Sequence, residues 1–125
     1  DNFNIQLDVF NENYEGKPHN HETWGVLGVI SGILGVTDYH LSNNKLNTIR
    51  KSILKNGATS GFKAFDDWHS TETFEYPQVA SFHIYGKDFN LDQGKRYVEG
   101  KGIEDYTRGA LYMFEKNHEI IVMKG

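Results

Sequence analysis

The chain of 125 residues is long enough for one domain and too short for two, so residues 1–125 are expected to fold as a single domain. A hydrophobic fraction of 38% with 14% aromatic residues excludes a disordered chain, and the absence of cysteine excludes disulfides and thiolate metal sites. The net charge of −4 argues against a domain whose main task is to bind phosphates, since such domains carry an excess of cations.

The distribution of apolar residues predicts no membrane segment. The opening residues DNFNIQLDVF lack the basic and apolar regions of a signal peptide. The longest apolar run, residues 24–36, is too short to cross a bilayer. Together with the absence of cysteine, these features predict a cytoplasmic protein that does not contact a membrane.

The first predicted element is a strand over residues 3–10. Apolar and polar residues alternate throughout FNIQLDVF, and a period of two indicates a strand with one buried face. The polar segment that follows contains Gly16 and Pro18 and is expected to form a loop.

A glycine-rich helix is predicted next, over TWGVLGVISGILGV at residues 23–36. Glycines recur at 25, 28, 32 and 35, and on a helix this spacing places them within one sector of about 80°. Glycine inside a helix costs about 1 kcal/mol relative to alanine. We therefore expect a buried helix that packs closely against a sheet or another helix.

A second helix is predicted from residue 42 to residue 56. Ser42 is its expected N-cap, Gly57 its expected stop, and an apolar stripe repeats at helical spacing between them. Its outer face would carry the most basic part of the chain, for which a solvated surface is the default interpretation. These basic residues are Lys45, Arg50, Lys51 and Lys55.

After residue 58 the pattern changes to strands. Strands are expected in the aromatic segment 61–70, in the alternating segment 78–86 and at 119–123, with a short helix near 102–110. The order of elements predicts an α+β fold, a ferredoxin-like or RRM-like antiparallel sheet with two helices.

The histidines form two clusters in the sequence, one in His19-Asn20-His21-Glu22 and one in Asp66-Asp67-Trp68-His69. These side chains suit zinc or another divalent metal if the fold brings them together. Their spacing matches no known metal cage, so scattered surface histidines are the preferred interpretation. Neither a metal nor a cofactor is predicted.

No sequence motif for nucleophilic catalysis or phosphate binding is present, because the chain lacks G-x-S-x-G, a Walker loop and G-x-G-x-x-G. Metal-free RNA cleavage needs only general acids and bases, for which His69, His83, Tyr85 and Lys63 are candidates. Such residues occur in most domains, so a non-catalytic protein is predicted.

Three segments in order carry a family resemblance. They are FNIQLDVF with H-E-T-W-G-V-L-G-V-I-S-G-I-L-G-V, then D-D-W-H-S, and then Y-M-F-E-K-N-H-E-I. They resemble the opening strand and glycine-rich helix, the R-D-Y-H-T motif and the Y-L-x-D-x-x-F-x-V strand of CasD-like RAMP proteins. This CRISPR-associated family caps the crRNA 5′ handle in type I Cascade. At residues 21–24 His-Glu-Thr-Trp stands for the family's Pro-Thr-Arg-Ser, so the chain resembles a truncated member without that arginine.

This resemblance implies a phage anti-CRISPR protein that mimics the handle subunit and blocks Cascade assembly without catalysis. Its partners would be the backbone or large subunit of Cascade. The expected contacts surround the D-D-W-H segment, where aromatic residues typical of interfaces are dense. They are Asp66, Asp67, Trp68, His69, Glu72, Phe74, Glu75 and Tyr76.

Two alternatives stay open within the resemblance. A genuine minimal handle subunit would bind crRNA through Lys17, Thr23 and the four basic residues of the second predicted helix. A metal-independent endoribonuclease would process crRNA precursors, as one subtype of the family does.

Overall fold

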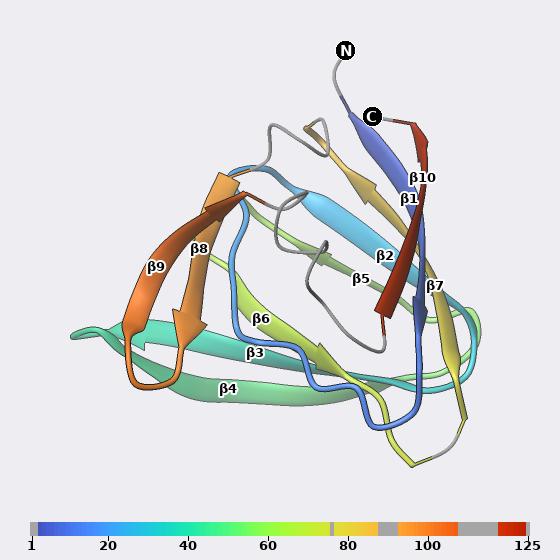
Figure 1. Ribbon diagram of the computed structural model, residues 1–125, viewed down its shortest axis with the longest axis horizontal. Coiled ribbons are helices and arrows are strands. Elements are labelled where there is room, and N and C mark those ends of the chain that lie inside the picture. Colours follow the sequence, from blue (N-terminus) through green and yellow to red (C-terminus); the bar gives the residue numbers. More distant parts are fainter. Residues whose placement is uncertain (1–2, 76, 88–92, 108–117, 125) are drawn as a thin grey trace.

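The protein is built from antiparallel strands (Figure 1). The computed structural model describes residues 3–75, 77–87, 93–107 and 118–124, and within them it contains ten strands and no helix, hence none that could cross a membrane. The strands are β1 Asn4–Phe10, β2 Gly25–Ser31, β3 Leu34–Ser42, β4 Lys45–Leu54, β5 Thr59–Phe62, β6 Trp68–Glu72, β7 Val79–Tyr85, β8 Gln93–Val98, β9 Gly102–Thr107 and β10 His118–Lys124.

The strands form two walls around one interior. One wall is a five-stranded sheet in the order β10-β1-β7-β2-β5, and the other contains the sheet β4-β3-β6 and the hairpin β8-β9. Isolated bridges from His19 to both His69 and Arg96 join β6 to β8. The hydrophobic core lies between the walls and includes Phe10 of β1 and Leu34 of β3.

The predicted α+β, ferredoxin-like fold is wrong, beginning with its glycine-rich helix. Residues 25–31 and 34–42 are strands β2 and β3, joined by a turn in which Gly32 has a φ of 90°. The segment is rich in valine and isoleucine, whose branched side chains favour strands. Gly25 is needed because a Cβ there would overlap the ring of Phe62 on β5. The four glycines therefore do not share one helical face.

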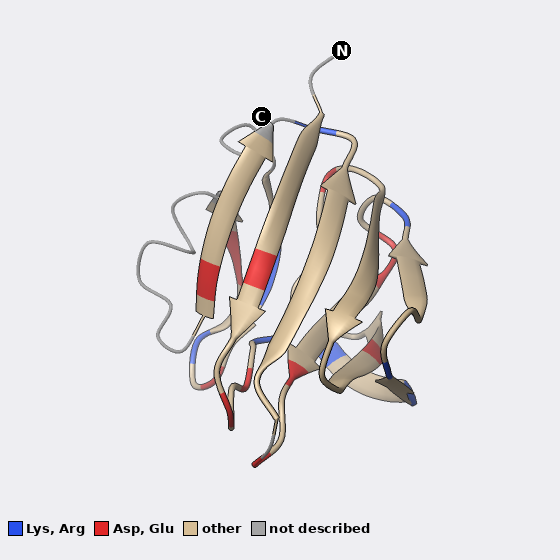
Figure 2. Cartoon of the chain, turned by 90° about the vertical axis from the view of Figure 1, so that its right-hand side faces the viewer, with Lys and Arg blue, Asp and Glu red and all other residues tan. Residues whose placement is uncertain are grey.

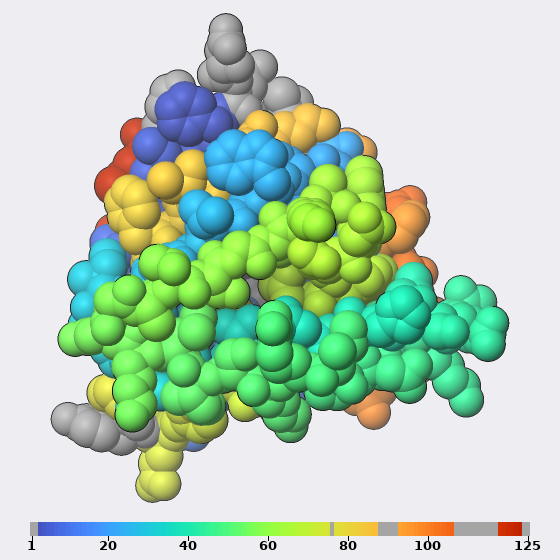
Figure 3. All heavy atoms as spheres, turned by 180° about the vertical axis from the view of Figure 1, so that it is seen from behind, coloured from blue at the N-terminus to red at the C-terminus, as the bar shows by residue number. Residues whose placement is uncertain are grey.

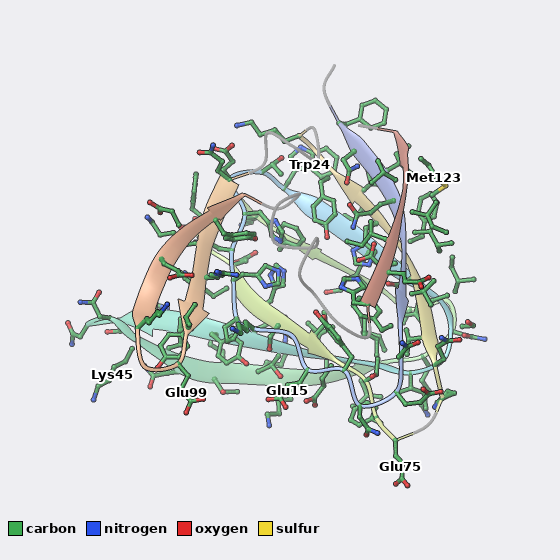
Figure 4. The ribbon with its side chains drawn as sticks, viewed as in Figure 1. Glu15, Trp24, Lys45, Glu75, Glu99 and Met123 are labelled. Carbon is green, nitrogen blue, oxygen red and sulfur yellow. The ribbon has the colours of Figure 1, made fainter. Side chains whose placement is uncertain are left out.

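The second predicted helix is strand β4. Ser42 pairs with Lys45, and between them Asn43 and Asn44 have φ values of 53° and 61°. Positive φ at both central residues is typical of the type I′ turn that closes a two-residue hairpin, and asparagine tolerates it well. The hairpin projects from the body at the lower right of Figure 3, and Lys45 lies near its tip (Figure 4).

The strand predictions for residues 3–10, 78–86 and 119–123 are confirmed by β1, β7 and β10. The aromatic segment 61–70 contains the end of β5 and the start of β6 rather than one strand. The short helix predicted near 102–110 is contradicted by β9 over its first six residues, and its remainder lies outside the described residues.

The buried face of β1 is its polar one. Asn4, Gln6 and Asp8 are at most 1% exposed, whereas the apolar residues between them are only half-buried. Strand β7 repeats this arrangement, since Ser81 and His83 point inward. The five-stranded sheet thus lines the interior with polar groups and turns an apolar face outward.

The turn at Gly32 supplies a test of the β2–β3 hairpin. A Cβ at residue 32 would lie 2.5 Å from the carbonyl oxygen of Gln78, whereas a Cβ at Gly57, which has a similar φ of 81°, would meet nothing. Gly57→Ala should cost about 1 kcal/mol of unfolding free energy for the left-handed backbone alone. Gly32→Ala should cost roughly 1–3 kcal/mol more, because the new methyl group overlaps the backbone. Urea unfolding measures both values, and equal costs would contradict the close approach.

Candidate metal centre

Three histidines meet inside the fold. His19 and His21 lie on the extended segment between β1 and β2, and because they are two residues apart their imidazoles point to the same side. His69 lies on β6, and its backbone exchanges two hydrogen bonds of 2.9 Å with the backbone of His19. This direct pairing places the third imidazole beside the first two.

The three imidazoles are close enough to share one ion. One ring nitrogen from each lies within 4.8 Å of the other two. The ring centroids are 4.9 Å apart for His19 and His21, 4.6 Å for His19 and His69, and 5.3 Å for His21 and His69. His21 and His69 are buried, so the cluster lies within the fold.

Backbone carbonyl groups orient two of the rings. His19 Nδ1 lies 2.8 Å from the carbonyl oxygen of Lys17, and His69 Nδ1 lies 3.2 Å from that of Asp67. A carbonyl oxygen only accepts hydrogen bonds, so each Nδ1 must carry the proton and each neutral ring keeps its lone pair on Nε2. Such outer contacts commonly fix the tautomer of histidines that bind metals.

The surroundings keep His69 neutral. Burial lowers the pKa of His69 well below its ordinary value, and the nearby imidazoles of His19, His21 and His83 lower it further. The Asp67 carbonyl acts in the opposite direction and is outweighed. Neutral imidazole is the form that binds metals, so the cluster is prepared for a cation without first losing a proton from His69.

A second polar group faces this cluster from the five-stranded sheet. Asp8 Oδ2 lies 3.0 Å from His118 Nε2 and 3.6 Å from His83 Nε2, and Asp8 Oδ1 accepts a hydrogen bond of 2.6 Å from Gln6. His83 Nδ1 in turn lies 3.1 Å from the Tyr85 hydroxyl. These contacts connect the buried carboxyl group of Asp8 through His83 to the phenol of Tyr85.

Asp8 is ionised despite its burial. Burial by itself raises the pKa of the carboxyl group, but His83, His118 and Gln6 together lower it below its ordinary value. This carboxylate can accept a hydrogen bond from His118 Nε2 and lies beside the imidazole of His83. The sheet thus presents groups that can give and take protons.

Both groups line one cavity, to which His19 and His69 contribute from one side and Asp8, His83 and Tyr85 from the other. Lys17 and Arg96 line it as well, and Arg96 pairs with Glu104 at 2.6 Å. His83 and Tyr85 are candidates from the sequence only for RNA cleavage. Asp8 and His118 carry no signal in the sequence, because only the pairing of β1 with β7 and β10 brings them together.

The histidine clusters of the sequence are joined in space, although scattered surface histidines were expected. His21 and His69 are buried, so that interpretation is wrong for both. Glu22 lies apart from the imidazoles and pairs with Lys87. Lys63 also lies apart and lines a different pocket.

The residues predicted to contact a partner do not form one surface. Trp68 and His69 are buried, Asp67 accepts a hydrogen bond from the Lys63 backbone, and Tyr76 lies outside the described residues. Glu75 points away from the body (Figure 4). Contact of another protein with the accessible members, which are Asp66, Asp67, Glu72, Phe74 and Glu75, stays a prediction.

The residues predicted to bind RNA are also dispersed. Thr23 is buried, and Lys17 lines the histidine cavity. Lys45, Arg50 and Lys51 lie on β4 and Lys55 directly follows it, so no basic helix face exists. Arg50 forms an ion pair of 3.1 Å with Asp38.

Comparisons with known proteins identify the fold. No protein-family model matches the chain, and no curated protein matches it. A cupin superfamily protein from Desulfitobacterium hafniense is similar, with 14% identity, a TM-score of 0.55, and coverage of 70% of each chain. The fold is that of the cupins.

Two further cupin structures agree. A sugar phosphate isomerase from a cupin superfamily of Silicibacter pomeroyi has 12% identity and a TM-score of 0.58, covering 86% of this chain and 69% of its own. An RmlC-like cupin protein from Ralstonia eutropha has 13% identity and a TM-score of 0.59, and the match covers 90% of this chain and 64% of the other.

The resemblance to CasD-like proteins is therefore wrong, because the glycine-rich segment that carried it is a β-hairpin in a cupin fold. The anti-CRISPR decoy and its two RNA alternatives lose their basis with it. The prediction of a non-catalytic protein is corrected too, since the fold brings three imidazoles within reach of one ion, an arrangement that suits a metal-dependent catalytic site.

The lowered pKa of His69 predicts an acid-labile fold in the metal-free protein. Below about pH 6.5 His69 is protonated in the unfolded chain but stays neutral in the folded protein. The free energy of unfolding therefore decreases as the pH falls, by up to about 1.4 kcal/mol per pH unit. His69→Gln should flatten this slope. Urea unfolding in chelator between about pH 5 and 7.5 measures it. His40→Ala, at an exposed position of β3, is the control, and an unchanged slope in His69→Gln would contradict the assignment.

Proposed function

We propose that the protein is a metal-dependent enzyme in which His19, His21 and His69 hold one divalent transition-metal ion. The observation that carries this proposal is the group of three ring nitrogens within 4.8 Å of one another. Two of the rings are fixed by backbone carbonyl groups with Nε2 as the donor atom, and burial keeps His69 neutral. Imidazole suits zinc, iron, copper and nickel.

Three protein ligands favour a catalytic rather than a structural site, since structural zinc sites use four. The bound ion would act as a Lewis acid on a substrate oxygen. The chain's own residues have separate tasks. Phe62 and Leu27 form apolar lining that limits water, and Lys17 and Arg96 give the cavity positive charge that suits an anionic substrate.

The sheet opposite the cluster would carry out proton transfer. Tyr85 lies against His21, with ring centroids 5.2 Å apart, and its hydroxyl group contacts His83. Asp8 stabilises the protonated form of His83, which can supply a proton to the phenolate of Tyr85, whereas neutral His83 can receive the proton of the phenol. Proton transfer next to a polarised carbonyl group is the chemistry of an aldose–ketose isomerase. The similarity in fold to a sugar phosphate isomerase supports this class of substrate.

Metal binding is the direct test. The purified protein should bind one Zn²⁺, Ni²⁺ or Fe²⁺ per chain in calorimetric titration and should melt at a higher temperature when loaded. Loss of an outer contact typically weakens metal affinity 10- to 100-fold, so loss of a ligand in His19→Ala, His21→Ala or His69→Ala should weaken it by more than about 100-fold.

His40→Ala is the matched control, because it removes an exposed imidazole on β3, a strand that carries none of the three ligands. It should bind like the wild type. Equal affinity in His40→Ala and His69→Ala, or no binding in the wild type, would contradict the metal centre.

Activity tests the acid–base part. Against a panel of aldose and ketose phosphates, Tyr85→Phe should keep metal affinity while the rate of interconversion falls by about 10²- to 10⁴-fold, the usual contribution of a general acid–base group. Tyr97→Phe alters a tyrosine outside the cavity lining and should leave the rate unchanged. Metal binding without turnover of any panel member would reject the isomerase and retain the metal centre.

A further inference from the structure

Asn20 lies between two of the three clustered histidines and points away from them. The segment around it is extended and bridges to β6 and β8, and side chains alternate along such a segment. The imidazoles of His19 and His21 therefore face the cavity, whereas the Asn20 amide faces the opposite side. A polar side chain on the outer side of a sheet is normally solvated. Asn20 is only 3% exposed, so other parts of the chain cover it.

Three separate elements form hydrogen bonds with Asn20. On β8, which runs beside this segment in Figure 1, the Lys95 N–H donates to Asn20 Oδ1 at 2.7 Å, and the Lys95 carbonyl accepts from the Asn20 N–H at 2.9 Å. On β9, the Tyr106 hydroxyl donates to the Asn20 carbonyl oxygen at 2.7 Å. Between β5 and β6, the Phe65 carbonyl accepts a bond of 3.1 Å from Asn20 Nδ2. These hydrogen bonds are called the Asn20 clamp below.

The backbone on both sides of Asn20 is adapted to these contacts. A Cβ at Gly94 would lie 2.3 Å from the Asn20 carbonyl oxygen, so the close approach of β8 requires glycine there. Phe65 has a φ of 57°, which is uncommon for a bulky residue, and its N–H donates to the His21 carbonyl oxygen at 2.7 Å. Unfavourable conformations of this kind persist where the surrounding structure fixes them, commonly at functional sites.

The side chain at position 20 must supply one acceptor and one donor, because it faces the N–H of Lys95 and the carbonyl of Phe65. Asparagine supplies both from one planar amide group. Aspartate has the same shape but offers only acceptors when ionised, and leucine offers neither. The contacts are therefore specific for asparagine.

We propose that Asn20 is a positioning residue, which holds the backbone between His19 and His21 so that both imidazoles stay directed toward the third. The Lys17 carbonyl orients the His19 ring, but it belongs to the same segment and moves with it. The Asn20 clamp ties this segment to three other elements and prevents its rotation. Outer contacts that orient metal ligands strengthen metal binding. The consequence for metal affinity rests on the proposed metal centre, whereas the placement of the rings does not.

The Asn20 clamp lies across the cavity from the groups proposed to transfer protons. Asp8, His83 and Tyr85 belong to the five-stranded sheet, which stands in front of the β8–β9 hairpin in Figure 2. None of the hydrogen bonds of the Asn20 clamp involves that sheet. A change at Asn20 is therefore expected to alter the placement of the ligands and not the opposite wall.

Zn²⁺ titration of the full chain tests the proposal with Asn20→Asp. This substitution sets a carboxylate oxygen against the Phe65 carbonyl and should weaken Zn²⁺ binding by about 10- to 100-fold. A negative charge near a cation would by itself strengthen binding, so a loss of affinity identifies the loss of positioning.

Thr73→Val is the matched control. Thr73 is buried, and its hydroxyl group accepts from the Tyr14 N–H and donates to the Asn11 carbonyl, so it ties an earlier part of the same segment to the chain directly after β6. This variant should unfold at a lower urea concentration yet bind Zn²⁺ like the wild type. Circular dichroism shows whether each variant is folded.

Tyr106→Phe is a milder probe of the Asn20 clamp if Asn20→Asp does not fold. It keeps the ring and removes the hydroxyl group that bonds to the Asn20 carbonyl, so it should weaken Zn²⁺ binding by about 10-fold. Tyr97→Phe, which removes a hydroxyl group from the neighbouring strand β8, should leave Zn²⁺ affinity unchanged.

Nuclear magnetic resonance of the imidazole nitrogens in the metal-free protein measures the positioning directly. The wild type and Thr73→Val should show His19 as one tautomer with its proton on Nδ1, whereas Asn20→Asp, or Tyr106→Phe in its place, should show a mixture. A wild type that binds no Zn²⁺ would reject the metal centre and leave this comparison to decide the role of Asn20. Wild-type affinity with a single His19 tautomer in Asn20→Asp would overturn the proposal, as would an equal loss of affinity in Thr73→Val.

Discussion

The reciprocal backbone hydrogen bonds between His19 and His69 join the two halves of the second wall and at the same time assemble the imidazole cluster. The same short segment bonds to β8, through Pro18 to Tyr97 and through Asn20 to Lys95. A single extended stretch thereby connects β6 with the β8–β9 hairpin. Because the ligand residues are part of this connection, the geometry of the site and the closure of the fold cannot vary independently.

The interior that results contains both hydrocarbon and polar networks. Phe10, Leu34 and Val79 form the apolar part, and His118 stacks on Phe10 with ring centroids 4.1 Å apart. Beyond this contact the hydrogen bonds of Asp8 begin. Burial of these polar groups is tolerable only because they bind one another, and it costs stability relative to an apolar filling. Such a cost is common where a site needs preorganised charge.

The sequence predicts part of this architecture. The period of two identifies β1, β7 and β10, because alternation depends only on local geometry. The alternation does not show which face of a strand is buried. The usual assumption buries the apolar face, but in β1 and β7 polar residues face the cavity. The helix expected at residues 42–56 fails for a local reason that was available. The Asn43-Asn44 pair is a hairpin turn signal, and it outweighs a coincidental helical spacing of leucines and isoleucines.

The site, too, is only partly predictable from the sequence. The H-x-H spacing of His19 and His21 already places two imidazoles together, but the third comes from β6 through a long-range pairing that no local pattern encodes. The glycine spacing suggested the incorrect resemblance to CasD-like proteins, although the individual glycines have different structural roles. Gly25 makes room for Phe62 and Gly32 forms a turn, so their regular spacing reflects no single structural cause.

Strand β4 lies at the open edge of its sheet and shows what its basic residues accomplish. An edge strand offers unpaired backbone groups on which another chain can extend the sheet. Lys45, Arg50 and Lys51 lie along this strand and Lys55 directly follows it. An incoming strand would have to desolvate these cations, so the long hairpin stays in solution instead of seeding fibrous aggregates. The residues that looked like a nucleic-acid surface in the sequence thus protect the fold against polymerisation.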